Sequence, residues 1–219
     1  MIATHKELLE LKFWIEEHAR EGYTAEREKL LLYMQAFGLP ASLPRLGEDG
    51  VHVLEIGTGP YWGLLQFMRF VDLYPGRICE RRWCPERLVA VDPLLDVFGL
   101  AGILEDRGGI FAVSQPFESF DTGWQFDAII TTNALDHGEM GFYLLPKIWR
   151  LLKPGGKLFL HVQLRPQSEL NLIHDHALTR AQLDKHLGYT TLVEEWVREY
   201  PADVDGKDHT AICGVWRKP

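Results

Sequence analysis

Residues 51–60 read Val51-His-Val-Leu-Glu55-Ile-Gly57-Thr-Gly59-Pro60, an apolar run that ends on a carboxylate and then breaks into two glycines one residue apart. This pattern predicts a strand that leads into a tight turn and then a helix. Glycine lacks a Cβ and tolerates positive φ, so a ligand can approach the turn closely, and the following helix N-terminus offers unpaired N–H groups. We therefore expect a nucleoside-type cofactor to bind here.

The turn lacks the features of two other nucleotide-binding loops. A dinucleotide fingerprint has a third glycine at its sixth position so that helix and strand pack closely, and this chain has Trp62 there. A buried carboxylate at Glu55 would also repel a pyrophosphate. No Gly-Lys-Ser/Thr follows the turn, which excludes a P-loop.

With an acidic-x-Gly-x-Gly pattern after a strand, the chain resembles the class I S-adenosylmethionine-dependent methyltransferases. Glu55, Gly57 and Gly59 match the family's first motif, and Tyr61 stands where many members have a third glycine. The resemblance implies a Rossmann-like α/β fold, with a mostly parallel seven-stranded sheet and an antiparallel C-terminal hairpin. It also implies S-adenosylmethionine as cofactor and S-adenosylhomocysteine as product, with these four residues around the methionine end.

Two later strand ends are expected to complete the cofactor site. Residues 87–91 form a second apolar run that ends on Asp92. A carboxylate at the carboxyl end of a neighbouring parallel strand can accept both hydrogen bonds of a ribose diol, so Asp92 is the ribose candidate. A fourth strand is expected within residues 125–137, and Asn133 at its end would line the wall beside the methyl group.

A helix, a turn and a fifth strand are expected over residues 150–162. Pro154 would stop the helix, Gly155 and Gly156 would reverse the chain, and Lys157–Val162 would re-enter the sheet. The segment between the second and fourth strands is less patterned, with a short third strand expected over Gly109–Ser114. The resemblance implies adenine contacts after it, from Gln115 or Glu118 to the amino group and from Phe117 to the ring. The alternative is a polar loop over an aromatic core residue.

Methyl transfer requires alignment of acceptor, methyl and sulfur, exclusion of water and, for some acceptors, removal of a proton. His137 follows the fourth strand, where the family places acceptor-contacting groups, and a neutral imidazole there would act as general base. Asp136 would orient it. The alternative is that His137 is simply a polar residue at the start of the next helix.

We expect one domain over residues 1–219, with an N-terminal helical cap at 1–45 and the methyltransferase core at 50–217. The cap would hold two helices, near 4–20 and 24–37, which either cover the substrate opening or pack against the sheet edge. After the fifth strand we expect a helix over 179–187 and two strands, Thr191–Tyr200 and His209–Trp216, joined by a turn at Asp205-Gly206.

Composition narrows the function classes. The 219 residues are 46% hydrophobic and carry a net charge of −8, which argues against a nucleic-acid substrate. No apolar stretch is long enough to span a bilayer, so we expect a cytoplasmic protein with no membrane partner. Three cysteines form no even disulfide framework, and we expect no metal site.

The acceptor class follows mainly from absent motifs. Asn133-Ala-Leu-Asp136 replaces the Asn/Asp-Pro-Pro-aromatic motif of enzymes that methylate DNA bases. A small molecule methylated on O or N is the favoured acceptor, and a homodimer is compatible with the sequence. One alternative is a catalytically silent domain that binds S-adenosylmethionine or a partner protein in a regulatory role. Another is a nicotinamide-dependent oxidoreductase, against which Trp62 argues.

Overall fold

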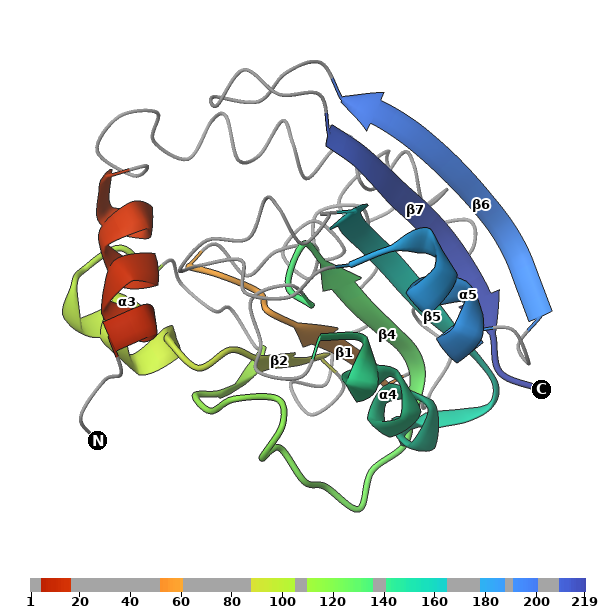
Figure 1. The fold of residues 1–219 in the computed structure, drawn as a ribbon. Coiled ribbons are helices and arrows are strands. Elements are labelled where there is room, and N and C mark those ends of the chain that lie inside the picture. Colours follow the sequence, from red (N-terminus) through yellow and green to blue (C-terminus); the bar gives the residue numbers. More distant parts are fainter. Residues whose placement is uncertain are drawn as a thin grey trace, which may run out of the picture.

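The computed structural model describes residues 5–16, 52–60, 88–104, 110–135, 141–164, 178–187, 191–200 and 209–219. Seven strands form one sheet in the order β3-β2-β1-β4-β5-β7-β6 (Figure 1). Their bounds are β1 Val53–Ile56, β2 Leu88–Val91, β3 Phe111–Val113, β4 Phe126–Thr132, β5 Leu152–Leu164, β6 Thr191–Tyr200 and β7 His209–Arg217.

Strand pairing agrees with the sequence prediction. Strand β1 pairs in parallel with β2 and β4, and the outer pairs β2–β3 and β4–β5 are also parallel. Strand β7 runs antiparallel to both β5 and β6. The expected mostly parallel seven-stranded sheet with an antiparallel C-terminal hairpin is therefore confirmed. Strands β1 and β2 are buried along their whole length, as expected for parallel strands covered on both faces.

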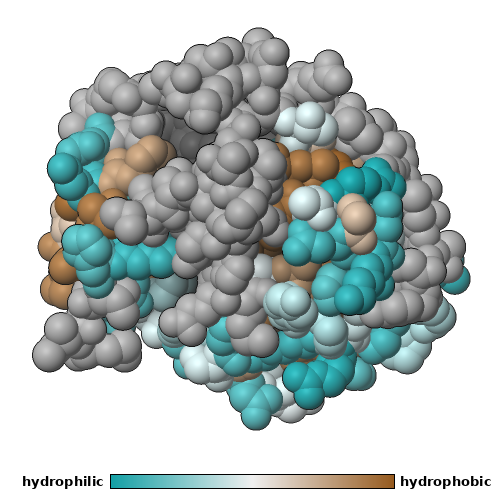
Figure 2. All heavy atoms as spheres, viewed as in Figure 1, coloured by the Kyte–Doolittle hydropathy of each residue, from teal (hydrophilic) through white to brown (hydrophobic). Residues whose placement is uncertain are grey.

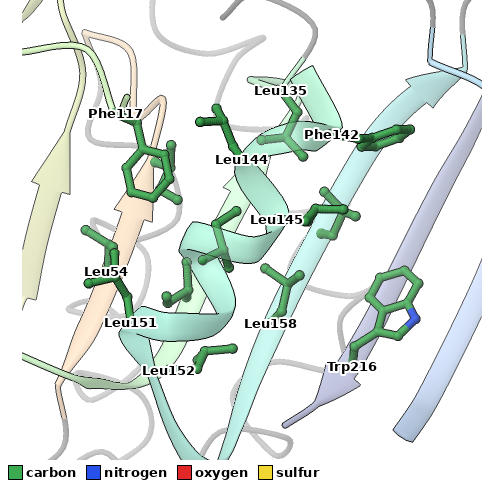
Figure 3. Packing of buried hydrophobic residues seen from close by; sticks show 14 of the residues in the cluster. Leu54, Phe117, Leu135, Phe142, Leu144, Leu145, Leu151, Leu152, Leu158 and Trp216 are labelled. Atoms are coloured by element: carbon green, nitrogen blue, oxygen red, sulfur yellow. The ribbon is translucent and has the colours of Figure 1, made fainter. Parts of the chain in front are cut away.

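Helices cover both faces of the sheet and bury two separate apolar clusters. On one face, α3 (Leu95–Leu100) and helical residues 5–16 pack against a cluster that includes Val53, Ala90 and Phe159. On the other face lie η2 (Gly141–Leu144), α4 (Leu145–Leu151) and α5 (Arg180–Leu187), over a cluster that includes Leu54 and Leu158 (Figure 3). The result is a three-layer α/β/α arrangement.

Helix α5 begins where its sequence pattern predicts. The backbone N–H of Gln182 donates to Thr179 Oγ1 at 3.3 Å, and the backbone N–H of Thr179 donates to Gln182 Oε1 at 2.9 Å. This reciprocal arrangement is a capping box, which satisfies donors that the first helical turn leaves unpaired.

The connection from α4 to β5 differs in detail from the expectation. Helix α4 ends at Leu151 rather than at Pro154, and Leu152 is already extended with ψ 137°. A residue that precedes proline disfavours the helical region, so the helix stops before Lys153. Gly155, with φ +76°, and Gly156 exchange backbone hydrogen bonds with Lys218 inside a continuous β5. The two glycines therefore form an irregularity within the strand instead of a separate turn.

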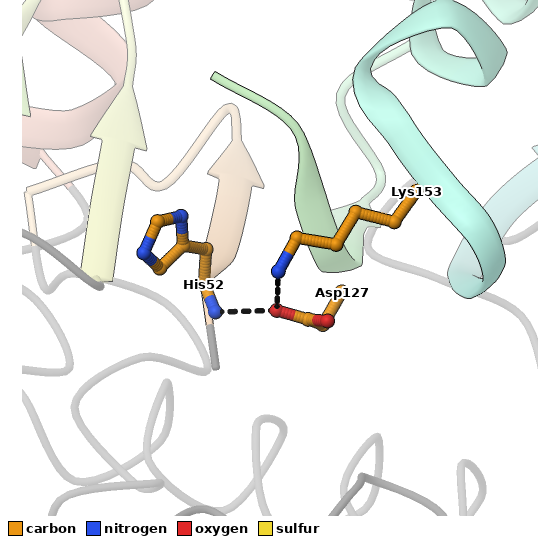
Figure 4. A network of polar contacts seen from close by, with 3 residues as sticks. All are labelled: His52, Asp127 and Lys153. Atoms are coloured by element: carbon orange, nitrogen blue, oxygen red, sulfur yellow. Dashed lines mark hydrogen bonds and ion pairs between the residues drawn. The ribbon is translucent and has the colours of Figure 1, made fainter. Parts of the chain in front are cut away.

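An ion pair joins strands at the amino edge of the sheet (Figure 4). Asp127 Oδ2 accepts a hydrogen bond from the backbone N–H of His52 at 2.8 Å and another from Lys153 Nζ at 2.7 Å. These contacts link the start of β4 to the residue before β1 and to β5. At the amino edge these contacts join three strands. The turn after β1 lies at the opposite, carboxyl edge.

The first expected cap helix is present over residues 5–16. Leu11 and Trp14 pack against the cluster beneath α3, and the Trp14 ring lies 6.3 Å from that of Phe98 at an interplanar angle of 77°. Its outer face keeps large apolar side chains exposed, and Figure 2 shows hydrophobic residues among hydrophilic ones where this helix and α3 lie. The second expected cap helix and the Asp205-Gly206 turn fall outside the described residues.

No helix within these described ranges is long and apolar enough to cross a bilayer.

Gly57 sits where a side chain has no room. Its φ is +70°, and an added Cβ would lie 2.2 Å from the Cβ of Ala134. Its backbone N–H donates to Val91 O at 2.9 Å, which ties the turn to β2. Both the backbone conformation and the packing therefore select glycine here.

We expect Gly57→Ala to lower the free energy of unfolding by about 2–4 kcal/mol, because left-handed strain adds to overpacking against Ala134. Gly155→Ala is the matched control, since Gly155 has φ +76° but nothing within 4 Å of an added Cβ. That control should cost only about 1–2 kcal/mol, the strain alone. Urea unfolding measures both, and equal losses would show that the contact with Ala134 contributes nothing.

Candidate functional site

The buried polar side chains of the described residues gather at one edge of the sheet. They number five and come from β1, β4, β5 and the turns that follow β1 and β2: Glu55, Thr58, Asp92, Thr131 and His161. Buried polar groups are uncommon and require partners. In open α/β sheets, ligands bind outside the carboxyl ends of the strands, so this edge is the candidate site.

The glycine turn is closed on one side by the N-terminal helix. Gly59 has φ +63°, and the nearest atom to an added Cβ would be in the Trp14 indole, at 3.4 Å. Helix 5–16 therefore borders the turn as well as the sheet. Ala134 occupies the space beside Gly57 and Trp14 the space beside Gly59, so glycine at both positions lets the turn pack tightly between these neighbours.

Asp92 joins the turn after β1 to the turn after β2. Its Oδ2 accepts from the Gly59 N–H at 3.0 Å, and its Oδ1 accepts from the Leu94 N–H at 2.9 Å. The residue is 7% exposed. Each carboxylate oxygen has more than one acceptor direction, so both oxygens can also accept from the hydroxyls of a ribose diol. The position and chemistry of Asp92 fit the predicted ribose contact.

Asn133 has a strained backbone at the end of β4. It is the one described non-glycine residue with positive φ, at 51°, and its N–H donates to His161 O at 2.9 Å. Its Oδ1 is buried and has no hydrogen-bond partner among the described residues, and the same is true of Thr58 Oγ1. A buried polar atom without a partner is costly, so a ligand that donates hydrogen bonds here would be stabilised.

His161 extends the polar row toward the antiparallel hairpin. On β5 it pairs in register with Thr132 of β4 and with Cys213 of β7. It is 1% exposed. The sequence placed His161 in the fifth strand, but it did not mark His161, Thr58 or Thr131 as site residues. The alternation of side chains along a strand predicts only which face of the sheet a residue lies on. Which residues of the other strands lie beside it is known only from the pairing register.

The loop after β3 adjoins Asp92 through the backbone. The Asp92 N–H donates to Val113 O at 3.2 Å, and Ser114 Oγ accepts from the Asp96 N–H at 3.1 Å. Gln115 and Glu118 are partly buried in this loop. The loop therefore lies beside the predicted ribose contact, as an adenine-binding segment would.

Phe117 is a core residue of this loop. It is 5% exposed and stacks on Phe120, with ring centroids 6.2 Å apart and an interplanar angle of 28°. Figure 3 shows the Phe117 ring on the face of the sheet covered by α4, near Leu54, Leu135 and Leu144. This packing is the alternative considered from the sequence. The stacking of Phe117 on adenine stays a prediction.

Some predicted residues lie outside the described ranges, namely Tyr61, Asp136 and His137. Their roles stay predictions. Within the described ranges, no group of three or more His, Cys, Asp or Glu side chains could hold a metal ion.

Comparisons with known proteins identify the architecture. No family model and no curated protein matches the chain. The N-methyltransferase NodS from Bradyrhizobium japonicum WM9, solved with S-adenosylhomocysteine, is 16% identical with a TM-score of 0.58, over 95% of this chain and 98% of that chain. A chain from the complex of the Haloferax volcanii Trm112 methyltransferase activator with a methyltransferase is 16% identical with a TM-score of 0.58, over 100% of both chains.

A third similar structure carries a different activity. The [4+2]-cyclase SpnF is 14% identical with a TM-score of 0.55, over 89% of this chain and 81% of that chain. At such identities the likeness concerns architecture alone. The chain therefore has the Rossmann-like fold of the class I S-adenosylmethionine-dependent methyltransferases, as the residues of the glycine turn implied.

Proposed function

We propose that this protein is an S-adenosylmethionine-dependent methyltransferase that transfers a methyl group to an O or N atom of a small-molecule acceptor. The observation that carries the proposal is the buried Asp92 carboxylate, which holds the Gly59 and Leu94 amides at the carboxyl edge of the sheet. A carboxylate in that position suits a ribose diol.

The remaining residues of the edge suit the other parts of the cofactor. The backbone of the turn at Gly57 and Gly59 would border the methionine moiety, with Glu55 behind it and Tyr61 over it. Asn133 Oδ1 and Thr58 Oγ1 are buried without partners among the described residues, so both suit donors on the ligand. Gln115, Phe117 and Glu118 would lie near adenine.

The residues of this chain would act mainly by positioning. S-adenosylmethionine, when bound, supplies an activated methyl group on a sulfonium. The carboxyl edge would hold it in line with the acceptor and exclude water. His137 would accept a proton from the acceptor, because a neutral imidazole is a competent general base.

The acceptor class and the cellular compartment are inferred from the charge, the similar structures and the cysteines, and not from a contact in the structure. A net charge of −8 disfavours a polyanionic acceptor. NodS is an N-methyltransferase, and three further matching structures, also N-methyltransferases, contain S-adenosylhomocysteine. Three cysteines form no even disulfide framework, which suits a reducing compartment and hence the cytoplasm. A homodimer is compatible with this proposal.

A second candidate is a catalytically silent domain that binds the cofactor or a partner protein in a regulatory role. Two comparisons favour considering it, because SpnF is a cyclase and the Haloferax methyltransferase was solved with an activator protein. A fold does not determine an activity. Both candidates allow cofactor binding. Only the enzyme would turn over, with release of S-adenosylhomocysteine.

Calorimetric titration of the cofactor-stripped protein tests the proposal directly. We expect S-adenosylmethionine and S-adenosylhomocysteine to bind with micromolar dissociation constants and NAD to show no binding. Release of S-adenosylhomocysteine in the presence of a panel of small amines and phenols then separates the enzyme from the silent domain. Absence of cofactor binding would reject both the proposed cofactor and the enzyme assignment.

Asp92→Ala should weaken S-adenosylhomocysteine binding about tenfold or more, because hydrogen bonds to a charged group contribute about 1.5–3 kcal/mol. Asp127→Ala is the matched control, a partly buried carboxylate with two donors at the opposite edge of the sheet. The control should lower the melting temperature but leave the dissociation constant unchanged. An unchanged constant in Asp92→Ala would contradict the ribose role.

His137→Asn should lower kcat by about 10²–10⁴-fold for an acceptor that must lose a proton. The dissociation constant of S-adenosylhomocysteine should stay the same, because the imidazole is assigned to the acceptor side. A variant that keeps the parent kcat would show that His137 is not the base.

A further inference from the structure

Lys147 of α4 reaches across to the loop after β3. Its Nζ donates to Phe117 O at 2.7 Å and to Glu118 O at 2.8 Å, and it lies 5.0 Å from the centroid of the Phe117 ring. The contacts join residues 30 and 29 positions apart in sequence. One ammonium therefore binds two consecutive carbonyls and lies over the ring of Phe117.

The ammonium is partly withdrawn from water to make these contacts. Burial lowers the pKa of Lys147, the carboxylates of Asp121 and Glu118 act in the opposite direction, and Arg150 lowers it further. A partly desolvated ammonium is stable only where acceptors replace its water. The two carbonyls and the ring face provide that replacement.

Hydrogen bonds within the loop tie the residues around Phe117 and Glu118 to one another. Pro116 O accepts from both the Ser119 N–H at 3.1 Å and the Ser119 hydroxyl at 2.9 Å. The Phe120 N–H bonds to the same carbonyl at 3.2 Å, and the Gln115 N–H bonds to Val113 O at 3.2 Å. Pro116 directly follows Gln115, so a displacement at Phe117 and Glu118 would reach Gln115 through this turn.

We propose that Lys147 is a positioning residue that fixes the Gln115–Glu118 loop in the conformation that recognises the adenine amino group. The inference rests on the proposed function. Lys147 acts through the loop, because its Nζ is occupied by the carbonyls of Phe117 and Glu118. It thereby couples α4, the helix that follows β4 and Asn133, to the base-recognition loop after β3.

Lys153 provides a matched control. Its Nζ also makes a short contact to a distant residue, at 2.7 Å from Asp127 Oδ2. That contact lies at the amino edge of the sheet (Figure 4). Loss of Lys153 therefore removes a comparable interaction without touching the loop after β3.

The test compares S-adenosylhomocysteine with S-inosylhomocysteine, which lacks the 6-amino group of adenine, by calorimetry. A site built around a hydrogen bond rejects a ligand that lacks it, so we expect the parent protein to prefer the adenine ligand about tenfold or more. Lys147→Met should weaken the adenine ligand about tenfold and the inosine ligand less than about threefold, so that the preference collapses. Lys147→Arg, which keeps donors and charge, should retain most of the preference.

Lys153→Met should lower the melting temperature while leaving the preference intact. Equal weakening of both ligands in Lys147→Met would overturn the proposal, because it would assign Lys147 only to stability. An unchanged preference would also overturn it. If Lys147→Met does not fold, Lys147→Leu gives the same comparison, also without a donor, and an intact preference there with normal stability overturns the proposal too.

Failure of the proposed function would give a different calorimetric result from failure of the role proposed for Lys147. A parent protein that binds neither ligand rejects the cofactor assignment and the role of Lys147 together. A parent protein that binds both ligands with a strong preference, unaltered in Lys147→Met, rejects only the role of Lys147.

Discussion

The site depends on the buried Asp92 carboxylate and the two amides that it accepts. A carboxylate that is 7% exposed requires donors, and it obtains them from the Gly59 and Leu94 N–H groups. These bonds hold the turn after β1 against the turn after β2. Gly57 adds a backbone bond to Val91 O. The same interactions that stabilise the carboxylate therefore bring the two turns together at the edge of the candidate site.

The two edges of the sheet have different physical roles. At the amino edge, Asp127 is satisfied by His52 and Lys153, so its charge serves to join strands (Figure 4). At the carboxyl edge, buried polar groups at Thr58 and Asn133 lack partners among the described residues. Stability accounts for the first arrangement. The second is costly in isolation and is explained best by a ligand, which is why the proposed function rests on that edge.

The helix layer on one face also reaches the site. Helix α4 buries its apolar residues against the sheet, and Lys147 extends from it to the carbonyls of Phe117 and Glu118. Packing of the Phe117 ring against Phe120 supplies the apolar floor of that contact. Core packing and the proposed base recognition would in this way be linked through a single loop. On the opposite face, Trp14 provides a comparable contact between the N-terminal helix and Gly59.

Local sequence patterns were sufficient for the strands, the glycine turn, the extent of α5 and the placement of Asp92 after β2. Each of these depends on a few adjacent residues, because apolar runs, glycine conformations and capping side chains act over short distances. The burial of Thr131 and His161, the core position of Phe117 and the contacts of Lys147 were decided only by the tertiary structure. They depend on strand register and on contacts between residues about thirty positions apart, and no local pattern specifies which distant segments become neighbours.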